Sequence, residues 1–208
     1  MGVIVVANSK GGAGKSTLAS NLAGYLARQG HRVMLGDTDA QQSARHWLEL
    51  RHEGLPSIEG WAVDGERLRS PKGVAHLVLD TPAGLHGKRL EQAVGVAQHI
   101  LVPLQPSPFD AQASLPFVRQ LQKLAGKRAQ APRIGLVVVR NKEGTQSSQQ
   151  VQAFLATAGL SPIAVLRDTQ NYIQLAARGL TLWDVAPSRV ERDLEQWQPL
   201  LEWLDLTD

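Results

Sequence analysis

The stretch that decides the fold is Lys10-Gly11-Gly12-Ala13-Gly14-Lys15-Ser16-Thr17. It follows directly on the apolar run of residues 3–7, so a buried strand leads into a glycine turn and then a helix. That order is the context that a phosphate-binding loop requires. The glycines let the backbone curl so that its N–H groups surround phosphates, and the helix start adds the positive end of its dipole. The sequence therefore predicts a nucleotide phosphate site at residues 11–17.

The loop carries one lysine more than phosphate binding needs. We expect Lys15 to reach the β and γ phosphates and the Ser16 hydroxyl to hold magnesium. The general pattern G-x-x-x-x-G-K-[ST] has glycine where this chain has Ser9, and Lys10 follows it. A solvated lysine on an ordinary glycine turn is the alternative for Lys10. The strand, the glycines, Lys15 and the helical pattern behind them all favour the nucleotide site.

Residues 9–16 resemble the deviant Walker A loop of the ParA and MinD family of ATPases. In that family the early lysine crosses to a second subunit and touches its nucleotide, so ATP becomes part of a dimer interface. The resemblance implies that Lys10 and Lys15 both take part in catalysis and that the ATP-bound state is a homodimer. A second cation at the γ-phosphate also suits phosphoryl transfer, in which catalysis is mostly positioning and charge stabilisation.

Length and composition indicate a globular protein with a buried core. The 208 residues fit one domain, which we expect to span residues 1–208. Hydrophobic residues make up 43% and charged residues 20%, which is unlike a disordered chain. Cysteine is absent, which excludes disulfides, thiolate metal sites and cysteine-ligated iron–sulfur clusters. Apolar runs are too short for a signal peptide core or a membrane span, so we expect a cytoplasmic protein.

Short apolar runs alternate with longer helical patterns along the whole chain. This alternation predicts an α/β fold: a doubly wound, mostly parallel sheet with helices on both faces, as in P-loop NTPases. The expected strands cover residues 3–8, 32–37, 75–80, 98–103, 133–140 and 162–166. Residues 54–74 contain several glycines and prolines and are expected to form a looser excursion around a short edge strand.

Carboxylates that serve metal binding and water activation are expected at the ends of later strands. Asp37 and Asp39 follow the apolar run of residues 33–36 and resemble the D-x-D-x-Q segment of ParA-like proteins. The resemblance implies that Asp39 aligns the attacking water near magnesium and that Asp37 supports the metal indirectly. Ala40 stands where the family usually has proline. The alternative is that both aspartates form a turn or cap a helix.

A third carboxylate ends the next apolar run. Asp80 follows residues 77–79 in the form of a Walker B strand and is expected beside magnesium, through water. The segment of residues 81–84 resembles the second switch of the family, with Gly84 as a backbone hinge. The alternative for Asp80 is a plain junction between a strand and a turn.

Two further segments have a functional and a structural interpretation. Asp110 closes the proline-rich segment of residues 102–110, which resembles a turn that flanks the nucleotide and the dimer contact in small partition ATPases. We favour a helix cap for Asp110 over a role in hydrolysis. Asn141 ends the buried strand of residues 136–140, where relatives have an adenine-contacting residue; a turn asparagine is the alternative.

Basic residues are unevenly distributed, although the formal net charge is only +3. No acidic residue occurs from residue 111 to 142, where Arg119, Lys123 and Lys127 follow at steps of four on a helix with an apolar opposite face. Such a stripe fits sequence-independent DNA binding through phosphates, and a solvated helix face is the alternative. Relatives often bind DNA nearer the C-terminus, which adds as candidates Arg167, Arg178, Arg189 and Arg192.

The resemblance extends to residues 179–184 and is closest to small ParA proteins without an N-terminal helix-turn-helix. It implies a weak ATPase with ATP and Mg²⁺ as cofactors, nonspecific DNA and a ParB-like protein as partners, and association with the nucleoid. Its use would be plasmid or chromosome partition or the positioning of another cargo. The alternatives are a MinD-like membrane-associated regulator and a dethiobiotin synthetase-like ligase. We expect no membrane binding, because acidic residues surround the apolar face of residues 190–204 and anionic lipid would repel them.

Overall fold

The computed structural model describes residues 2–61 and 74–206. Its strands form one seven-stranded sheet in the order β3-β2-β4-β1-β5-β6-β7, and every described pairing is parallel. The strands are β1 (Gly2–Val6), β2 (Val33–Asp37), β3 (Ile58–Trp61), β4 (His76–Asp80), β5 (His99–Leu104), β6 (Arg133–Asn141) and β7 (Pro162–Arg167). The predicted doubly wound fold is confirmed.

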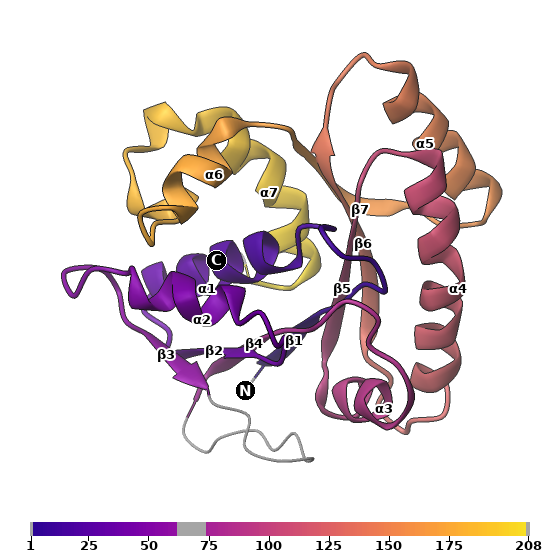
Figure 1. Ribbon diagram of the computed structural model, residues 1–208, viewed down its shortest axis with the longest axis horizontal. Helices are drawn as coiled ribbons and strands as arrows, with labels where there is room; N and C mark the ends of the chain where they lie inside the picture. Colours follow the sequence, from indigo (N-terminus) through magenta and orange to yellow (C-terminus); the bar gives the residue numbers. More distant parts are fainter. Residues whose placement is uncertain (1, 62–73, 207–208) are drawn as a thin grey trace.

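Helices cover both faces of the sheet (Figure 1). One face carries α1 (Lys15–Arg28), α2 (Ser43–Glu49), α6 (Gln170–Ala176) and α7 (Glu191–Trp203), with the short 3₁₀ turns η1 (Leu182–Asp184) and η2 (Pro187–Arg189) between the last two. The other face carries α3 (Gly87–Val96), α4 (Pro108–Ala125) and α5 (Gln146–Thr157).

The central strand β1 is buried on both faces, which explains its uninterrupted apolar sequence. Ile4 and Val6 pack into the core on the α1 side, whereas Val3 and Val5 pack into the core on the α3 side. Successive side chains of a strand point to opposite faces, and both faces are covered here. Each residue of the strand therefore has to be apolar, and the carboxyl end of β1 delivers the glycine loop to the middle of the sheet edge.

The six strands expected from the sequence are all present, with small differences at their ends. The ladder of β1 ends at Val6, two residues earlier than expected, because the chain turns toward the glycine loop there. Strand β3 lies at the sheet edge, as expected for residues 54–74, but residues 62–73 of that excursion fall outside the described residues. Within the described ranges, no helix has the length and apolar character that crossing a membrane requires.

A buried ion pair fastens the segment before α7 to the rest of the molecule. Arg51 donates to the carboxylate of Asp184 over 2.8 Å, and their side chains are 6% and 0% exposed. The same carboxylate accepts hydrogen bonds from the backbone N–H and hydroxyl of Thr181, at 2.8 and 2.7 Å. Thr181 in turn packs against Gly24 of α1, where an added Cβ would collide with it. This segment therefore sets the position of α1, the helix behind the glycine loop.

We predict that Arg51→Met lowers the free energy of unfolding by about 3–5 kcal/mol, because it leaves a buried carboxylate unpaired. Urea denaturation at neutral pH measures this loss, and the double variant Arg51→Met/Asp184→Leu should recover part of it.

The loss of unfolding free energy in Arg51→Met should depend on pH. Burial by itself raises the pKa of Asp184, but hydrogen bonds from Arg51 and Thr181 outweigh it and hold the pKa below its usual value. A lowered pKa contributes stability above about pH 4 that is lost as the pH falls through the native pKa. The difference between wild type and Arg51→Met should therefore shrink in acid. Equal stability of the two proteins at neutral pH would contradict this role of the pair.

Candidate nucleotide site

The carboxyl ends of the central strands open into a cavity of about 1240 Å³. It is lined by the glycine loop of residues 11–17, by residues 37–43 after β2, and by residues 81–83 after β4. Doubly wound sheets bind their ligands at this edge. Ligand cavities commonly measure roughly 300–1,000 Å³, so this one has room for a nucleotide.

The glycine loop presents an open inner surface to this cavity. Gly12 and Gly14 have φ of 69° and 85°, in the left-handed region that favours glycine. No heavy atom lies within 4 Å of the position that a Cβ would take on Gly11 or Gly12. Helix α1 begins directly after Gly14, and no side chain caps its first N–H groups. Uncapped N–H groups at a helix start are the donors that a phosphate accepts from, so the loop fits a nucleotide.

The two lysines of the loop make different contacts. Lys15 is buried, and its Nζ donates to the carbonyl oxygen of Lys10 at 3.1 Å. Burial lowers the pKa of Lys15, against the opposing charges of Asp80 and Asp39. Lys10 is partly exposed, and its ammonium forms an ion pair with Asp110 at the start of α4. Only Lys15 is therefore held inside the loop.

The expectation that Asp110 caps a helix is wrong. The N-cap position of α4 is Ser107, no side chain caps this helix, and Asp110 lies inside its first turn. The helix begins at Pro108, whose fixed φ suits the first helical position and places Asp110 two residues further along. A carboxylate in the first turn is still favoured by the helix dipole, and this one is paired with Lys10.

Asp80 is buried at the floor of the site. Neither of its carboxylate oxygens has a hydrogen-bond partner among the described residues. Burial raises the pKa of Asp80 to about 7; the Ser16 hydroxyl and the Lys15 charge act against this rise, and the carboxylates of Asp37 and Asp39 add to it. The Ser16 hydroxyl lies close enough to lower the pKa without completing a hydrogen bond. An unpartnered carboxylate beside a hydroxyl fits Mg²⁺, which prefers oxygen ligands.

Asp37 and Asp39 both line the cavity, but they differ in their hydrogen bonds. The carboxylate of Asp37 accepts from the backbone N–H groups of Asp39 (2.9 Å), Ala44 (2.8 Å) and Arg45 (3.3 Å), so it caps α2 and fixes the loop after β2. Asp39 lines the cavity, and one of its carboxylate oxygens accepts from the N–H of Gln41 at 3.0 Å. Asp37 thus positions the segment on which Asp39 stands.

The described residues contain no cluster of three His, Asp or Glu side chains that could hold a metal ion by themselves. This arrangement is compatible with Mg²⁺ at a nucleotide site, where one or two carboxylates act together with a hydroxyl, water and the phosphates of the substrate. Ser16 and Asp80 supply the protein part of such a ligand set.

A smaller cavity of about 270 Å³ lies beside the loop, sharing Gly14 and Thr17 with it. Its walls are largely apolar and include Val139, Leu166, Tyr172 and Ile173. An apolar pocket with one aromatic ring in its wall suits a nucleotide base. The base end of a nucleotide whose phosphates lie in the glycine loop fits this second cavity.

Asn141, the residue expected to contact the base, lies outside the two cavities, whereas its neighbour Arg140 lines both. Asn141 is buried at the end of β6, its Oδ1 has no hydrogen-bond partner among the described residues, and it lines neither cavity. Arg140 lines both cavities, and its φ of 55° is unusual for a residue other than glycine. The structure therefore adds Arg140 to the candidate site.

Two residues that the sequence analysis missed hold the loop in place. Asn8 is buried, accepts from the N–H of Lys10 at 3.1 Å and donates to the carbonyl oxygen of Pro103 at 2.6 Å. Gln105 donates to the carbonyl oxygen of Gly12 at 2.9 Å. The polar Asn8 directly after an apolar strand was a usable signal, whereas nothing local marks Gln105.

The candidate DNA-binding residues do not lie together. Arg119 and Lys123 on α4 and Lys127 in the turn after it are exposed, whereas Arg178 and Arg189 are exposed on the opposite side of the sheet. Two other candidates are engaged in ion pairs: Arg167 with Asp193, and Arg192 with Glu143.

Comparison with known proteins gives a consistent result. The sequence model of the CbiA family, described as the CobQ/CobB/MinD/ParA nucleotide binding domain, matches residues 4–182. The chromosome-partitioning ATPase Soj of Thermus thermophilus is 32% identical over 188 residues, which cover 73% of this chain and 74% of Soj. The maintenance of carboxysome distribution protein A of Gloeobacter kilaueensis is 38% identical over 117 residues. That match covers 52% of this chain and spans only about half, 51%, of the relative.

Solved structures share the fold at low sequence identity. The ATP complex of a Cyanothece McdA variant has a TM-score of 0.73 at 16% identity and covers 96% of both chains. A chain of the MinC:MinD cell division protein complex of Aquifex aeolicus has a TM-score of 0.74 at 17% identity, covering 100% of this chain and 97% of that one. The family match spans most of the sequence, and the Soj match covers more than two thirds of both proteins. The chain therefore belongs to the CobQ/CobB/MinD/ParA family of nucleotide-binding domains, in which the ParA- and MinD-type proteins are ATPases.

Proposed function

We propose that this protein is a weak Mg²⁺-dependent ATPase that forms a homodimer around ATP, binds DNA nonspecifically in that state, and drives plasmid or chromosome partition or the positioning of another cargo. A ParB-like partner would stimulate hydrolysis and reset the cycle. The observation that carries the proposal is the second lysine. The Lys15 ammonium lies inside the glycine loop, where it donates to the Lys10 carbonyl oxygen, whereas the Lys10 ammonium is partly exposed and contacts Asp110 outside the loop. Relatives named for chromosome partitioning and carboxysome distribution support the positioning role, and with it a cytoplasmic, nucleoid-associated protein.

The residues of the site divide the chemistry of hydrolysis among them. The N–H groups of the glycine loop and of the α1 start would bind the phosphates, with Lys15 at the β and γ positions. Ser16 and Asp80 would hold Mg²⁺, which neutralises charge on the phosphates when bound. Asp39 would orient a water toward the γ-phosphorus, so that the bond to the β-phosphate oxygen breaks and ADP and phosphate leave. Lys10 of a second subunit would stabilise the charge that develops on the transferred group.

A MinD-like membrane role has no support from the C-terminal helix. Trp197, Leu200 and Leu201 of α7 are each no more than 1% exposed, because this face of the helix packs into the core with α1 and β7. A helix that lies on a membrane needs a free apolar face and basic residues beside it. The exposed residues of α7 include Glu191, Glu195 and Glu202.

One observation favours the second candidate, a dethiobiotin synthetase-like ligase. The large cavity extends beyond the loop to Lys88, Arg89 and Gln92 of α3, and two cations there suit a carboxylate on a small second substrate. Such an enzyme would not be stimulated by DNA and would not need Lys10 to dimerise. Stimulation of ATP hydrolysis by duplex DNA therefore separates the two functions, because only the partition ATPase should show it.

We predict that Lys10→Ala still binds ATP but no longer dimerises with it, because Lys15 keeps the phosphate contacts while the cross-subunit cation is lost. Light scattering after size exclusion, with and without ATP, measures the dimer, and a fluorescent ATP analogue measures binding. Lys15→Ala should lose ATP binding itself. The control is Lys142→Ala, an exposed lysine just after β6, which should behave as wild type. An ATP-dependent dimer of Lys10→Ala would overturn the proposed interface.

We predict that Asp39→Ala slows hydrolysis by roughly 100-fold or more, in the range that a lost general base or water-positioning group costs. ATP should remain bound, so the dimer should persist after the wild type has returned to monomers. Sizing at intervals after one addition of ATP measures this. Glu49→Ala, an exposed carboxylate on α2, is the matched control. Normal turnover by Asp39→Ala would assign water positioning to another residue.

We predict that Asp110→Asn lets the protein dimerise at about two- to five-fold lower ATP concentration. The ion pair holds Lys10 within its own subunit, and partly exposed pairs are worth up to about 1 kcal/mol. Titration of ATP while dimer formation is followed by light scattering gives the midpoint. A higher midpoint would mean that Asp110 assists the dimer.

A further inference from the structure

The charge of this chain is concentrated in one continuous segment. Residues 111–167 contain eight Lys or Arg and a single acidic residue, Glu143, although the net charge of the chain is only +3. Glu143 is itself paired with Arg192 of α7. The segment comprises most of α4 together with β6, α5 and β7, so two of the seven strands and the two helices beside them lie in a part of the chain with a strong excess of positive charge.

Two neighbouring helices of this segment cover the same face of the sheet (Figure 1). Helix α4 buries Phe117, Val118 and Leu121 and exposes Arg119 and Lys123, and Lys127 is exposed in the turn that follows the helix. Helix α5 contains no charged residue, and its exposed positions include several glutamines. The one carboxylate of these two helices, Asp110, lies in the first turn of α4 and is paired with Lys10. The rest of their surface carries cations and neutral amides, which are residue types that contact phosphates.

The cations of α4 are available to a partner. No ion pair in the described ranges of the chain engages Arg119, Lys123 or Lys127. Arg167, by contrast, forms two hydrogen bonds, of 2.5 and 3.2 Å, with the fully buried carboxylate of Asp193. Transferring Arg167 to a phosphate would leave that buried carboxylate without its cation, which is costly.

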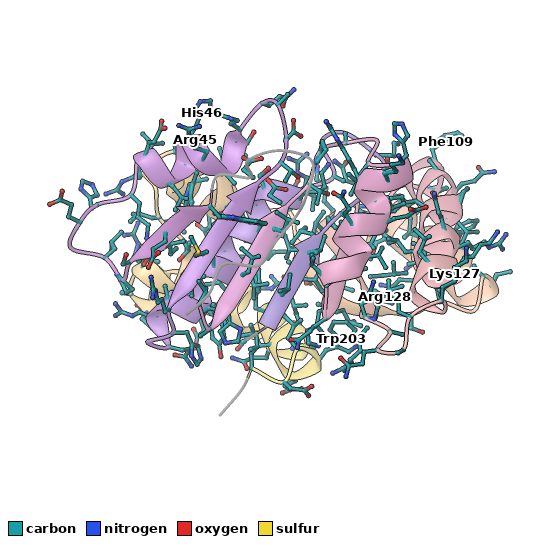
Figure 2. All side chains as sticks on the ribbon, turned by 90° about the horizontal axis from the view of Figure 1, so that it is seen from below. Arg45, His46, Phe109, Lys127, Arg128 and Trp203 are labelled. Carbon is teal, nitrogen blue, oxygen red and sulfur yellow. The ribbon has the colours of Figure 1, made fainter. Side chains whose placement is uncertain are left out.

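The dimensions of the stripe match a duplex. Eight residue steps separate Arg119 on α4 from Lys127 in the turn after it, which corresponds to about 12 Å at the helical rise of ~1.5 Å per residue. Over that length a duplex carries roughly seven phosphate charges at one per ~1.7 Å. Figure 2 shows Lys127 and Arg128 at the end of α4 that lies away from Phe109, which is in the first turn of this helix, next to the Asp110 that pairs with Lys10 of the glycine loop. A duplex on this surface would therefore lie clear of the nucleotide cavity.

We propose that duplex DNA binds along the surface of α4 and α5, through phosphate contacts from Arg119, Lys123 and Lys127. This inference rests on the proposed function and assigns the DNA surface that it needs. The arginines nearer the C-terminus are then not the principal contacts. Because long cations and amides reach phosphates without reading bases, binding is sequence-independent and weakens steeply with salt.

The test compares two variants that each remove three positive charges. The first is Arg119→Ala/Lys123→Ala/Lys127→Ala, and the control is Arg178→Ala/Arg189→Ala/Arg192→Ala. Binding of the full chain to a random-sequence duplex is measured by fluorescence anisotropy in a non-hydrolysable ATP analogue, over a series of KCl concentrations. Each lost phosphate contact lowers the slope of log K against log salt by about 0.9, so the α4 variant should lose about 2.7 for each subunit that contacts the DNA, or about 5.4 for a dimer that uses both stripes. The control should keep the wild-type slope.

Every outcome decides the question. The triple variant that loses DNA binding should keep the wild-type rate of ATP hydrolysis without DNA and the wild-type thermal midpoint, because the three replaced residues are exposed. If those properties change, the single charge reversal Lys123→Glu replaces the triple variant, and it should weaken DNA binding more than Arg189→Glu does. If the wild type binds DNA and the α4 variant binds equally well, or if both variants lose equally, the surface assignment is wrong while the proposed function stands. If the wild type binds no DNA in any nucleotide state, both fail.

Discussion

The candidate site is organised around two opposite charges, Lys15 and Asp80, that are buried at the edge of β1 and β4 without forming an ion pair within the described ranges. Burying an unpaired charge costs several kcal/mol. Burial accordingly moves both pKa values toward the neutral forms, downward for Lys15 and upward for Asp80. A phosphate and a divalent cation together would satisfy both groups, so a nucleotide with its metal would stabilise the folded chain by an amount that grows with the logarithm of the ligand concentration relative to Kd.

The surrounding structure keeps this unfavourable arrangement in place. The loop is tied to the strand ends on both sides: Gly84 donates its N–H to the carbonyl oxygen of Ser9 at 2.9 Å, and Gln105 binds Gly12. Behind the loop, α1 packs against the segment that the buried Arg51–Asp184 pair fastens. The connection through Gly84, whose φ is 70°, also links the loop to the segment after β4 that lines the cavity. A movement of that segment on nucleotide binding would therefore shift the loop that carries Lys10, through the hydrogen bond between Gly84 and Ser9.

The sequence predicted those features that local chemistry determines. Strands buried on both faces are apolar along most of their length, so β1 and the other interior strands were recognised, and the order of strand, glycines and helix located the loop. Asp110 was misassigned because capping is a local rule, whereas its actual partner, Lys10, lies 100 positions away in the chain. Arg140 was missed for a related reason. It belongs to the candidate site only because the fold places it in the wall of both cavities at the end of β6. Nothing within a few residues of either position reports such contacts.

If Lys10 joins two subunits and α4 holds DNA, ATP can control DNA binding without any change in α4 itself. Three cations on one subunit give a strongly salt-dependent but weak contact, because each phosphate contact adds only a modest term. Dimerisation places two such stripes on one particle, and the second then binds at a high effective concentration once the first is engaged. The exponent of the salt dependence would double, and affinity at low salt would rise far more than two-fold. Hydrolysis that separates the subunits would then release DNA by halving the number of phosphates held.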